Sequence, residues 1–404
     1  MTLKHFGCNL NPWDNAMPTG TEFRGKINHV RLVLKRTKPI GTDAQGDTIY
    51  HLMSPSEMAA YYGPIAKDMN NQGFTVMFIG TSESFGDGGI PEGQPPWVGG
   101  VSWNMFIPAY TRFMEQVLRK LHEMGIRFSY QHWNEPDPKD PKDAHSSRIM
   151  SADIYGPFHQ SVAKMVRQID PTINVLTAGF CTGAGEQVEY FQKAERSVGG
   201  KLVMDFYATH PYGTYVGRVP YLPGKWFGSM KTHFDYINAH LGVPVWVTEW
   251  SGYTDDHALL DPMYFPALGK YLTDSVLYMN SRPEIWGATW FGVTDSNRKS
   301  GVKFHDGKPK PYVYEAFCNA WKGVAVVQPP VVSGGIDVTG RANLRAERAL
   351  CGKILGLIEP KSGQIIPTDR QESLQFKIGN VDEWVGVSVN GLKGYIRGDK
   401  LRWL

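Results

Sequence analysis

The sequence lacks the features that would place it in a specialised class. Its four cysteines, Cys8, Cys181, Cys318 and Cys351, form no CxxC pair and no Cys/His spacing typical of a zinc site. No apolar run reaches the length of a membrane-spanning helix, and no signal peptide precedes the first strand-like segment. We therefore expect buried thiols, no metal and no membrane span. Either a leader was removed before this chain begins, or export follows another route.

A strong charge bias is also absent. The 42 Lys and Arg residues against 39 Asp and Glu residues leave a net charge of +3, without any long basic run, so nucleic acid is not an expected partner. The 12 tryptophans are an aromatic surplus, which suits stacking against sugars but also ordinary core packing. The 404 residues suit one barrel of typical size followed by a small second domain.

Strand-like and helix-like segments alternate along residues 1–323. This alternation predicts parallel strands with helical crossovers, and eight repeats predict an α/β protein with a (β/α)8 or TIM barrel. The expected strands are His5–Asn11, His29–Lys35, Phe74–Gly80, Ile126–Trp133, Ile173–Gly179, Met204–His210, Val243–Thr248 and Ile285–Trp290. The expected helices are Ser56–Asn70, Ile107–Met124, Tyr155–Ile169, Gly185–Ser197, Gly228–Leu241, Tyr264–Asn280 and Pro311–Lys322.

The connections differ on the two sides of the predicted barrel. Helix-to-strand links are short, as at Gly125 and Gly242, whereas strand-to-helix links such as 81–104 and 211–225 are long and rich in Gly, Pro and aromatic residues. All elaboration is thus expected at the carboxyl ends of the strands, where barrel enzymes carry their sites.

Two glutamates follow apolar strands at this face. In Trp133-Asn134-Glu135-Pro136, the proline ends the strand and favours an extended Glu135. In Val247-Thr248-Glu249-Trp250, a second strand closes on a glutamate. Glycoside hydrolysis needs one protonated and one ionised carboxyl group on opposite sides of a sugar ring. The pair therefore indicates a glycosidase, although a single glutamate after a strand is often only a loop charge.

At these residues the chain resembles a clan A retaining glycoside hydrolase, a group that includes cellulase-like, mannanase-like and xylosidase-like families. The resemblance covers roughly residues 5–323 and implies that Glu135 is the acid/base and Glu249 the nucleophile. It also implies that the reaction needs no metal or organic cofactor. The residues expected to bind substrate are Arg31, His132, Asn134, His210, Tyr212 and Trp290. The loops after strands three and six match no family pattern, so the sugar stays open.

The helical period disappears after a Pro- and Gly-containing linker, residues 324–335. Residues 336–404 are predicted to form short strands, at Ala342–Ala346, Lys353–Ile358, Gln364–Pro367, Leu374–Ile378, Trp384–Val389 and Gly394–Ile396. Asn390-Gly391 is the expected hairpin turn. This small all-β domain resembles a bacterial SH3 domain, which implies binding to the cell wall; a stabilising domain without a ligand is the alternative.

These observations predict a retaining β-glycoside hydrolase that degrades a polysaccharide, namely a bacterial cell-wall or surface glycan, outside the cell. A hydrolase of plant-type β-glucan, mannan or xylan is the alternative enzyme. A catalytically silent carbohydrate-binding barrel is the alternative from another class, since a fold alone does not guarantee chemistry.

Overall fold

The structure is a computed structural model, and its chain divides into two compact units. The first unit consists of Met1–Thr254 and Leu268–Val324, and the second of Asp255–Ala267 and Ala325–Leu404. The predicted linker, residues 324–335, lies outside the described residues, and the predicted domain boundaries stay predictions. The structure describes residues 3–10, 20–43, 45–85, 103–138, 149–214, 230–253, 264–295, 301–321, 336–338, 342–346, 353–358, 365–367, 384–389, 392–397 and 400–403.

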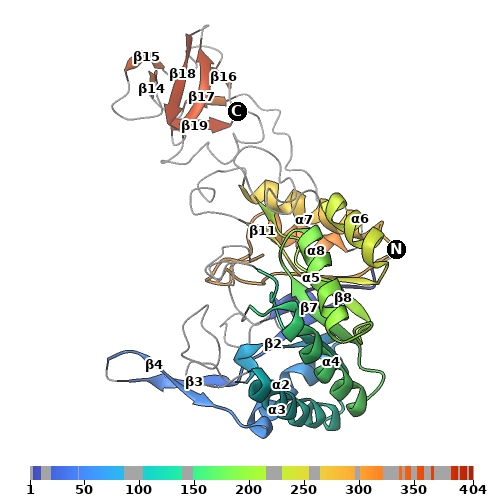
Figure 1. Ribbon diagram of the computed structural model, residues 1–404. Helices are drawn as coiled ribbons and strands as arrows, with labels where there is room; N and C mark the ends of the chain where they lie inside the picture. Colours follow the sequence, from blue (N-terminus) through green and yellow to red (C-terminus); the bar gives the residue numbers. More distant parts are fainter. Residues whose placement is uncertain are drawn as a thin grey trace. The chain divides into compact units, whose positions relative to one another are not determined.

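The first unit is a closed barrel of eight parallel strands in the order β1-β12-β10-β8-β7-β6-β5-β2, with helices packed around it (Figure 1). The predicted (β/α)8 fold is therefore confirmed. The barrel strands are β1 His5–Leu10, β2 His29–Leu34, β5 Thr75–Gly80, β6 Phe128–His132, β7 Val175–Phe180, β8 Phe206–Thr209, β10 Val245–Trp250 and β12 Ile285–Trp290. The helices are α1 Gly20–Phe23, α2 Pro55–Asn71, η1 Ser82–Ser84, α3 Trp103–Glu123, α4 Ala152–Ile169, α5 Ala184–Ser197, α6 Met230–Leu241, α7 Tyr264–Asn280 and α8 Val313–Ala320.

Local sequence signals explain where these elements begin and end. Helix α2 starts at a capping box, in which the Ser54 amide donates to Glu57 and the Glu57 amide donates to the Ser54 hydroxyl. At the other end of the helices, Gly125 and Gly242 have φ values of 68° and 59°. Glycine adopts this left-handed conformation readily, so helices α3 and α6 can turn into the next strand within a few residues.

One feature was not foreseen from the sequence. Between β2 and α2 the chain forms an antiparallel hairpin of β3 (Thr37–Thr42) and β4 (Thr48–Leu52), which extends away from helices α2 and α3 (Figure 1). We call residues 37–52 the β3–β4 ribbon. Two further short strands, β9 (Gly213–Thr214) and β11 (Gly252–Tyr253), pair in parallel after the sixth and seventh barrel strands.

Aromatic rings fill the barrel interior at the amino-terminal ends of the strands. The indole of Trp246 stacks on His5 with 4.9 Å between ring centroids and lies 5.0 Å from His29, while Phe206 packs against its edge. His29 and Trp246 have no exposed surface. This end of the barrel is therefore a packed core, and the chemistry is confined to the other end.

Buried histidines make the stability of the barrel sensitive to acid. Burial lowers the pKa of His5, His159 and His233 to about 4 and that of His29 and His132 well below the ordinary value. Below the unfolded pKa of about 6.5, the unfolded chain therefore binds protons that the folded chain excludes. We expect the free energy of unfolding to fall from pH 6.5 towards pH 4, by up to about 1.4 kcal/mol per pH unit for each such histidine.

Urea denaturation at several pH values measures this dependence. His233→Gln removes one of the buried groups and is expected to reduce the slope, whereas His240→Gln removes an exposed imidazole and is expected to leave the slope unchanged. Equal slopes for the wild type and His233→Gln would show that His233 does not contribute.

The second unit contains a seven-stranded sheet in the order β15-β14-β18-β17-β16-β13-β19, antiparallel in every pairing. Among the described residues of this unit, nine buried side chains, including Leu344, Val387 and Ile396, form an apolar core. The predicted strand Leu374–Ile378 and the turn Asn390-Gly391 lie outside the described residues. The strands are β13 Ile336–Val338, β14 Ala342–Arg345, β15 Ile354–Ile358, β16 Ile365–Pro367, β17 Trp384–Val389, β18 Leu392–Arg397 and β19 Leu401–Trp403.

Within the part of the chain that the structure describes, no helix combines the length and the apolar character required to cross a membrane.

Candidate active site

Glu135 lies three residues beyond β6 on a segment attached to both neighbouring strands. The amide of Trp133 donates to the Gly80 carbonyl at 2.8 Å, and the amide of Glu135 donates to the Gly179 carbonyl at 3.0 Å. Gly80 ends β5 and Gly179 belongs to β7, so these bonds hold the segment from opposite sides. Glu135 is 4% exposed.

The expectation of an extended Glu135 is wrong. Its φ is 46° and that of Trp133 is 72°, so both residues adopt the left-handed conformation that L-residues rarely occupy. The hydrogen bonds to β5 and β7 hold this conformation against the extended preference of a residue before proline. Such a residue costs about 1–3 kcal/mol, and functional sites are where this strain is usually found.

Glu249 reaches the same site through a bulge in β10. Val247 pairs with Ala288 and Trp250 with Trp290, so three steps along β10 correspond to two along β12. The extra residue breaks the alternation of the strand and allows Thr248 and Glu249 both to contact residues of the barrel interior. Bulges of this kind are often found beside active sites, where they re-aim a side chain.

Arg31 of β2 connects the interior side chains. Its guanidinium group has no exposed surface and donates to Glu249 at 2.6 Å, to Gln131 at 2.8 Å, to Asn134 at 2.9 Å and to Asn9 at 3.0 Å. A buried arginine needs such partners, because an unpaired charge away from water is costly. Because the Arg31 guanidinium can only donate, the Asn134 atom that faces it is the amide oxygen.

Glu249 is held in its ionised form. Burial would raise its pKa, but the neighbouring charges of His210 and Arg31 and hydrogen bonds from Tyr212 and Arg31 outweigh burial and lower the pKa to about 2. The Tyr212 hydroxyl donates to the second carboxylate oxygen at 2.5 Å. At neutral pH the group is therefore an oriented carboxylate, the form that can act as a nucleophile.

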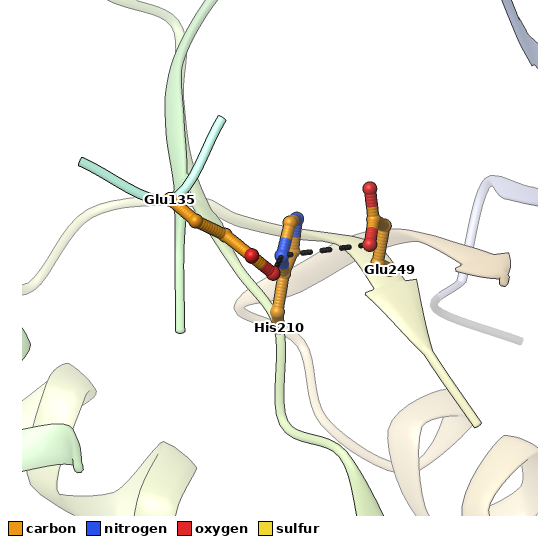
Figure 2. A group of neighbouring side chains, drawn as sticks. All are labelled: Glu135, His210 and Glu249. Carbon is orange, nitrogen blue, oxygen red and sulfur yellow. Dashed lines mark hydrogen bonds and ion pairs between the residues drawn. The ribbon is translucent and has the colours of Figure 1, made fainter. Parts of the chain in front are cut away.

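His210 lies between the two glutamates (Figure 2). Its Nδ1 is 2.8 Å from a Glu135 oxygen and 3.7 Å from a Glu249 oxygen, and its Nε2 is 3.1 Å from the Thr248 hydroxyl. One ligand atom from each of the three residues lies within 4.8 Å of the others, a spacing that could also hold a metal ion. The Arg31 charge on Glu249 opposes a cation there, and the arrangement instead suits two carboxyl groups that act on one substrate bond.

Gly179 makes room for His210. A methyl group at this glycine would lie 2.0 Å from the Nε2 atom of His210, so Gly179→Ala must displace the ring from Glu135 and Thr248. We expect kcat/KM to fall on the order of 10²-fold, the usual cost of a misplacement of about 1 Å in a catalytic group. Initial rates on an activated aryl β-glycoside measure this loss.

Gly183→Ala is the matched control, because the nearest atom to its added methyl group is 3.7 Å away. Full activity of Gly179→Ala, with a fold intact by circular dichroism, would contradict a need for the His210 position.

Two residues predicted to bind substrate are fully buried and pack against neighbouring rings. His132 has no exposed surface, and its ring contacts Phe158 and His159 of α4, so it belongs to the layer between β6 and that helix. Trp290 is likewise fully buried and packs edge-on against Trp250, which contacts Tyr271 of α7. Arg31, Asn134, His210 and Tyr212 are brought together around the carboxyl pair.

Several residues of the site were not singled out from the sequence. Gln131 and Asn9 accept hydrogen bonds from Arg31, Thr248 contacts His210, and the half-buried ring of Phe291 lies 5.9 Å from that of Tyr212. The sequence carried a signal for Gln131. Successive side chains of a strand point to opposite faces of the sheet, so Gln131 and His132 cannot both face the barrel interior. Phe291 follows Trp290 directly, so the aromatic residue near the site is one position further along.

Comparisons with known proteins agree with this geometry. A family model described as "Glycosyl hydrolase catalytic core" matches residues 106–312, just over half of the chain. A search of curated proteins gave no match. This family match rests on the sequence and covers Glu135, His210 and Glu249.

Solved structures share the fold at low sequence identity. The GH53 catalytic domain of Ignisphaera aggregans has a TM-score of 0.53 at 12% identity, covering 79% of this chain and 96% of its own. A family 5 xyloglucanase from Paenibacillus pabuli has a TM-score of 0.54 at 13% identity, with coverages of 80% and 98%. A family 39 glycoside hydrolase from Bacteroides cellulosilyticus has a TM-score of 0.51 at 16% identity, with coverages of 99% and 79%. Together with the family match, the barrel and its carboxyl pair show that the chain belongs to the glycosyl hydrolase catalytic core family and is a glycoside hydrolase.

Proposed function

We propose that the enzyme is a retaining β-glycosidase acting on a polysaccharide. The observation that carries the proposal is the carboxyl pair, in which one oxygen of Glu135 and one of Glu249 lie within 4.8 Å of each other. Retaining glycosidases place their two carboxyl groups about 5–5.5 Å apart, whereas inverting enzymes leave about 6.5–9.5 Å for a water molecule.

The proposed reaction has two displacements at the anomeric carbon. In the first, Glu249 attacks this carbon and Glu135 gives a proton to the departing glycosidic oxygen, leaving a sugar esterified to Glu249. In the second, Glu135 removes a proton from water, whose oxygen attacks the same carbon and releases Glu249. Arg31 and Tyr212 stabilise the Glu249 carboxylate before the first displacement and again when the second displacement releases it, and Asn134 would bind a substrate hydroxyl.

Labelling with 2-deoxy-2-fluoro sugars tests the mechanism. Incubation with the β-glucosyl, β-galactosyl, β-xylosyl and β-mannosyl fluorides, followed by peptide mass analysis, is expected to find the sugar on Glu249, and Glu249→Gln should remain unlabelled. Proton NMR of the first product formed from a polymer should show the β-anomer. An α-anomer as first product would overturn retention.

We propose a bacterial cell-wall or surface glycan as substrate, with action outside the cell. The support is the resemblance of the C-terminal sequence to bacterial SH3 domains, together with the small all-β unit formed there. A module that binds the wall would raise the local concentration of substrate for the barrel. The plant-type alternative has its own support, since the structural neighbours include a xyloglucanase and fungal β-1,4-galactanases.

Retention on insoluble polymers separates these substrates. The full-length Glu249→Gln protein should pellet with purified bacterial sacculi and remain in solution with insoluble xylan or cellulose. The wild type should release reducing ends from the sacculi. Release from xyloglucan or β-1,4-galactan alone would favour the plant-type substrate and remove the wall-binding role.

A further inference from the structure

The backbone around Glu135 is held more firmly on one side of this residue than on the other. On the amino-terminal side, the amides of Trp133 and Glu135 donate to β5 and β7 at 2.8 and 3.0 Å. On the carboxyl side, Pro136 has no amide hydrogen, and its carbonyl accepts from the Met150 amide at 3.2 Å, the long end of the usual range. In the described part of the chain, this backbone attachment is weaker than the two that precede it.

Asp137 supplies a stronger attachment on the carboxyl side. It is 7% exposed, and its carboxylate accepts from the amides of Cys181 at 3.1 Å and Thr182 at 3.0 Å and from the Thr182 hydroxyl at 2.5 Å. Burial raises the pKa of Asp137, and these bonds oppose the rise because they favour the ionised acceptor. Asp137 thus ties the carboxyl side of Glu135 to the end of β7, the strand whose Gly179 carbonyl accepts from the Glu135 amide.

The residues that Asp137 contacts are themselves fixed to the barrel. The side-chain amide of Gln187, a fully buried residue of α5, donates to the Thr182 carbonyl at 2.6 Å and to the Phe180 carbonyl at 3.1 Å. The oxygen of the same side chain accepts from the hydroxyls of Tyr207 and Thr209 on β8. A buried polar network with its groups paired in this way is rigid. Asp137 is therefore bonded to a firm support.

We propose that Asp137 is a positioning residue for proton transfer by Glu135. Without its bonds, the left-handed Glu135 would relax towards the extended conformation that a residue before proline prefers, and its carboxyl group would leave the departing oxygen. Proton transfer requires close approach, whereas attack by Glu249 depends on its own contacts with Arg31 and Tyr212. The inference rests on the acid/base role proposed for Glu135.

The dependence of rate on the leaving group tests this role in Asp137→Ala. The measurement is kcat/KM, which reports the first displacement, on aryl β-glycosides of increasing leaving-group pKa. We expect a loss of about 10²-fold on phenyl glycosides, because a misplacement of about 1 Å has this cost, and of less than about 3-fold on dinitrophenyl glycosides, which need no proton. A residue that only stabilises the fold would lower all of these rates equally.

Variants of Thr182 test the same attachment if Asp137→Ala does not fold. Thr182→Val removes the hydroxyl that donates to Asp137, and Thr182→Ser keeps it. We expect Thr182→Val to lose about 10-fold on phenyl glycosides and to keep its rate on dinitrophenyl glycosides, since part of the attachment remains. Thr182→Ser should restore the wild-type dependence.

Asp170→Ala is the matched control. Asp170 precedes the opposite end of β7 and accepts from the amide and the hydroxyl of Thr172 at 2.8 and 2.7 Å, so it makes the same kind of contacts far from the carboxyl pair. Its removal should leave the dependence on the leaving group unchanged.

Equal losses across the series in Asp137→Ala would overturn the proposal. A raised KM with the same loss on every leaving group would also overturn it and make Asp137 a substrate contact. Glu135→Ala, measured on the same series, separates this inference from the catalytic one. A steep dependence in Glu135→Ala with equal losses in Asp137→Ala removes only the positioning role, whereas equal losses in Glu135→Ala remove the acid/base assignment itself.

Discussion

Glu249→Gln is expected to lower kcat on the order of 10⁴–10⁶-fold, the range seen when a catalytic nucleophile is removed. The amide that replaces the carboxylate cannot attack an anomeric carbon. It also leaves the Arg31 guanidinium, 2.6 Å from the carboxylate in the native protein, without its charged partner. Turnover of an activated aryl β-glycoside measures the loss, and circular dichroism checks that the variant folds.

The control for this substitution is Glu195→Gln, which changes a carboxylate that pairs with Lys201 on the outside of the barrel. It should retain wild-type activity. Azide gives an independent readout of the role of Glu249, because it can enter the space of the missing carboxylate in Glu249→Ala and form an α-glycosyl azide. A β-glycosyl azide from this variant would contradict the assignment of Glu249 as the nucleophile.

Glu135→Ala is expected to divide substrates by their leaving groups. Loss of a general acid should cost about 10²–10⁴-fold on unactivated sugars, whose departing oxygen needs a proton. Dinitrophenyl glycosides need no proton in the first displacement, so their attack by Glu249 should be spared and the glycosyl-enzyme should accumulate. Rates on a series of aryl glycosides of increasing leaving-group pKa measure this division.

Azide should restore turnover of dinitrophenyl glycosides by Glu135→Ala and give a β-glycosyl azide, since it replaces the water that Glu135 activates. Gly183→Ala, near the same end of β7, serves as the unaffected control. An equal loss on all leaving groups would remove Glu135 from the acid/base role.

The arrangement of the barrel could be predicted because its information is local and repeated. Strands such as Thr75–Gly80 and Ile285–Trp290 are short, largely apolar runs, and the glycines and polar caps at helix ends mark the connections. Parallel strands then bring Glu135 and Glu249 to one end of the barrel without any knowledge of their contacts. The clustering of Arg31 with both acids follows from the same geometry.

Details that depend on one residue of register could not be predicted. His132 and Trp290 were predicted to bind substrate, whereas the structure also places their neighbours beside the carboxyl pair, with Gln131 bonded to Arg31 and the ring of Phe291 beside that of Tyr212. The φ of Glu135 depends on hydrogen bonds to two other strands, which its own neighbours in sequence do not reveal. The β3–β4 ribbon was missed because its strands bury no apolar face within this chain, so the usual alternation of core and solvent is absent.

The bulge in β10 makes the enzyme dependent on the number of residues in one strand. Between Val247 and Trp250, β10 contains one residue more than the paired segment of β12, and this extra residue gives Glu249 its orientation. A deletion at this point would shift the register of the residues that follow, and we expect it to turn the Glu249 carboxylate away from Arg31 and Tyr212 although the glutamate itself is retained. The number of residues in this short segment, and not only the presence of the glutamate, therefore decides whether the carboxylate can act.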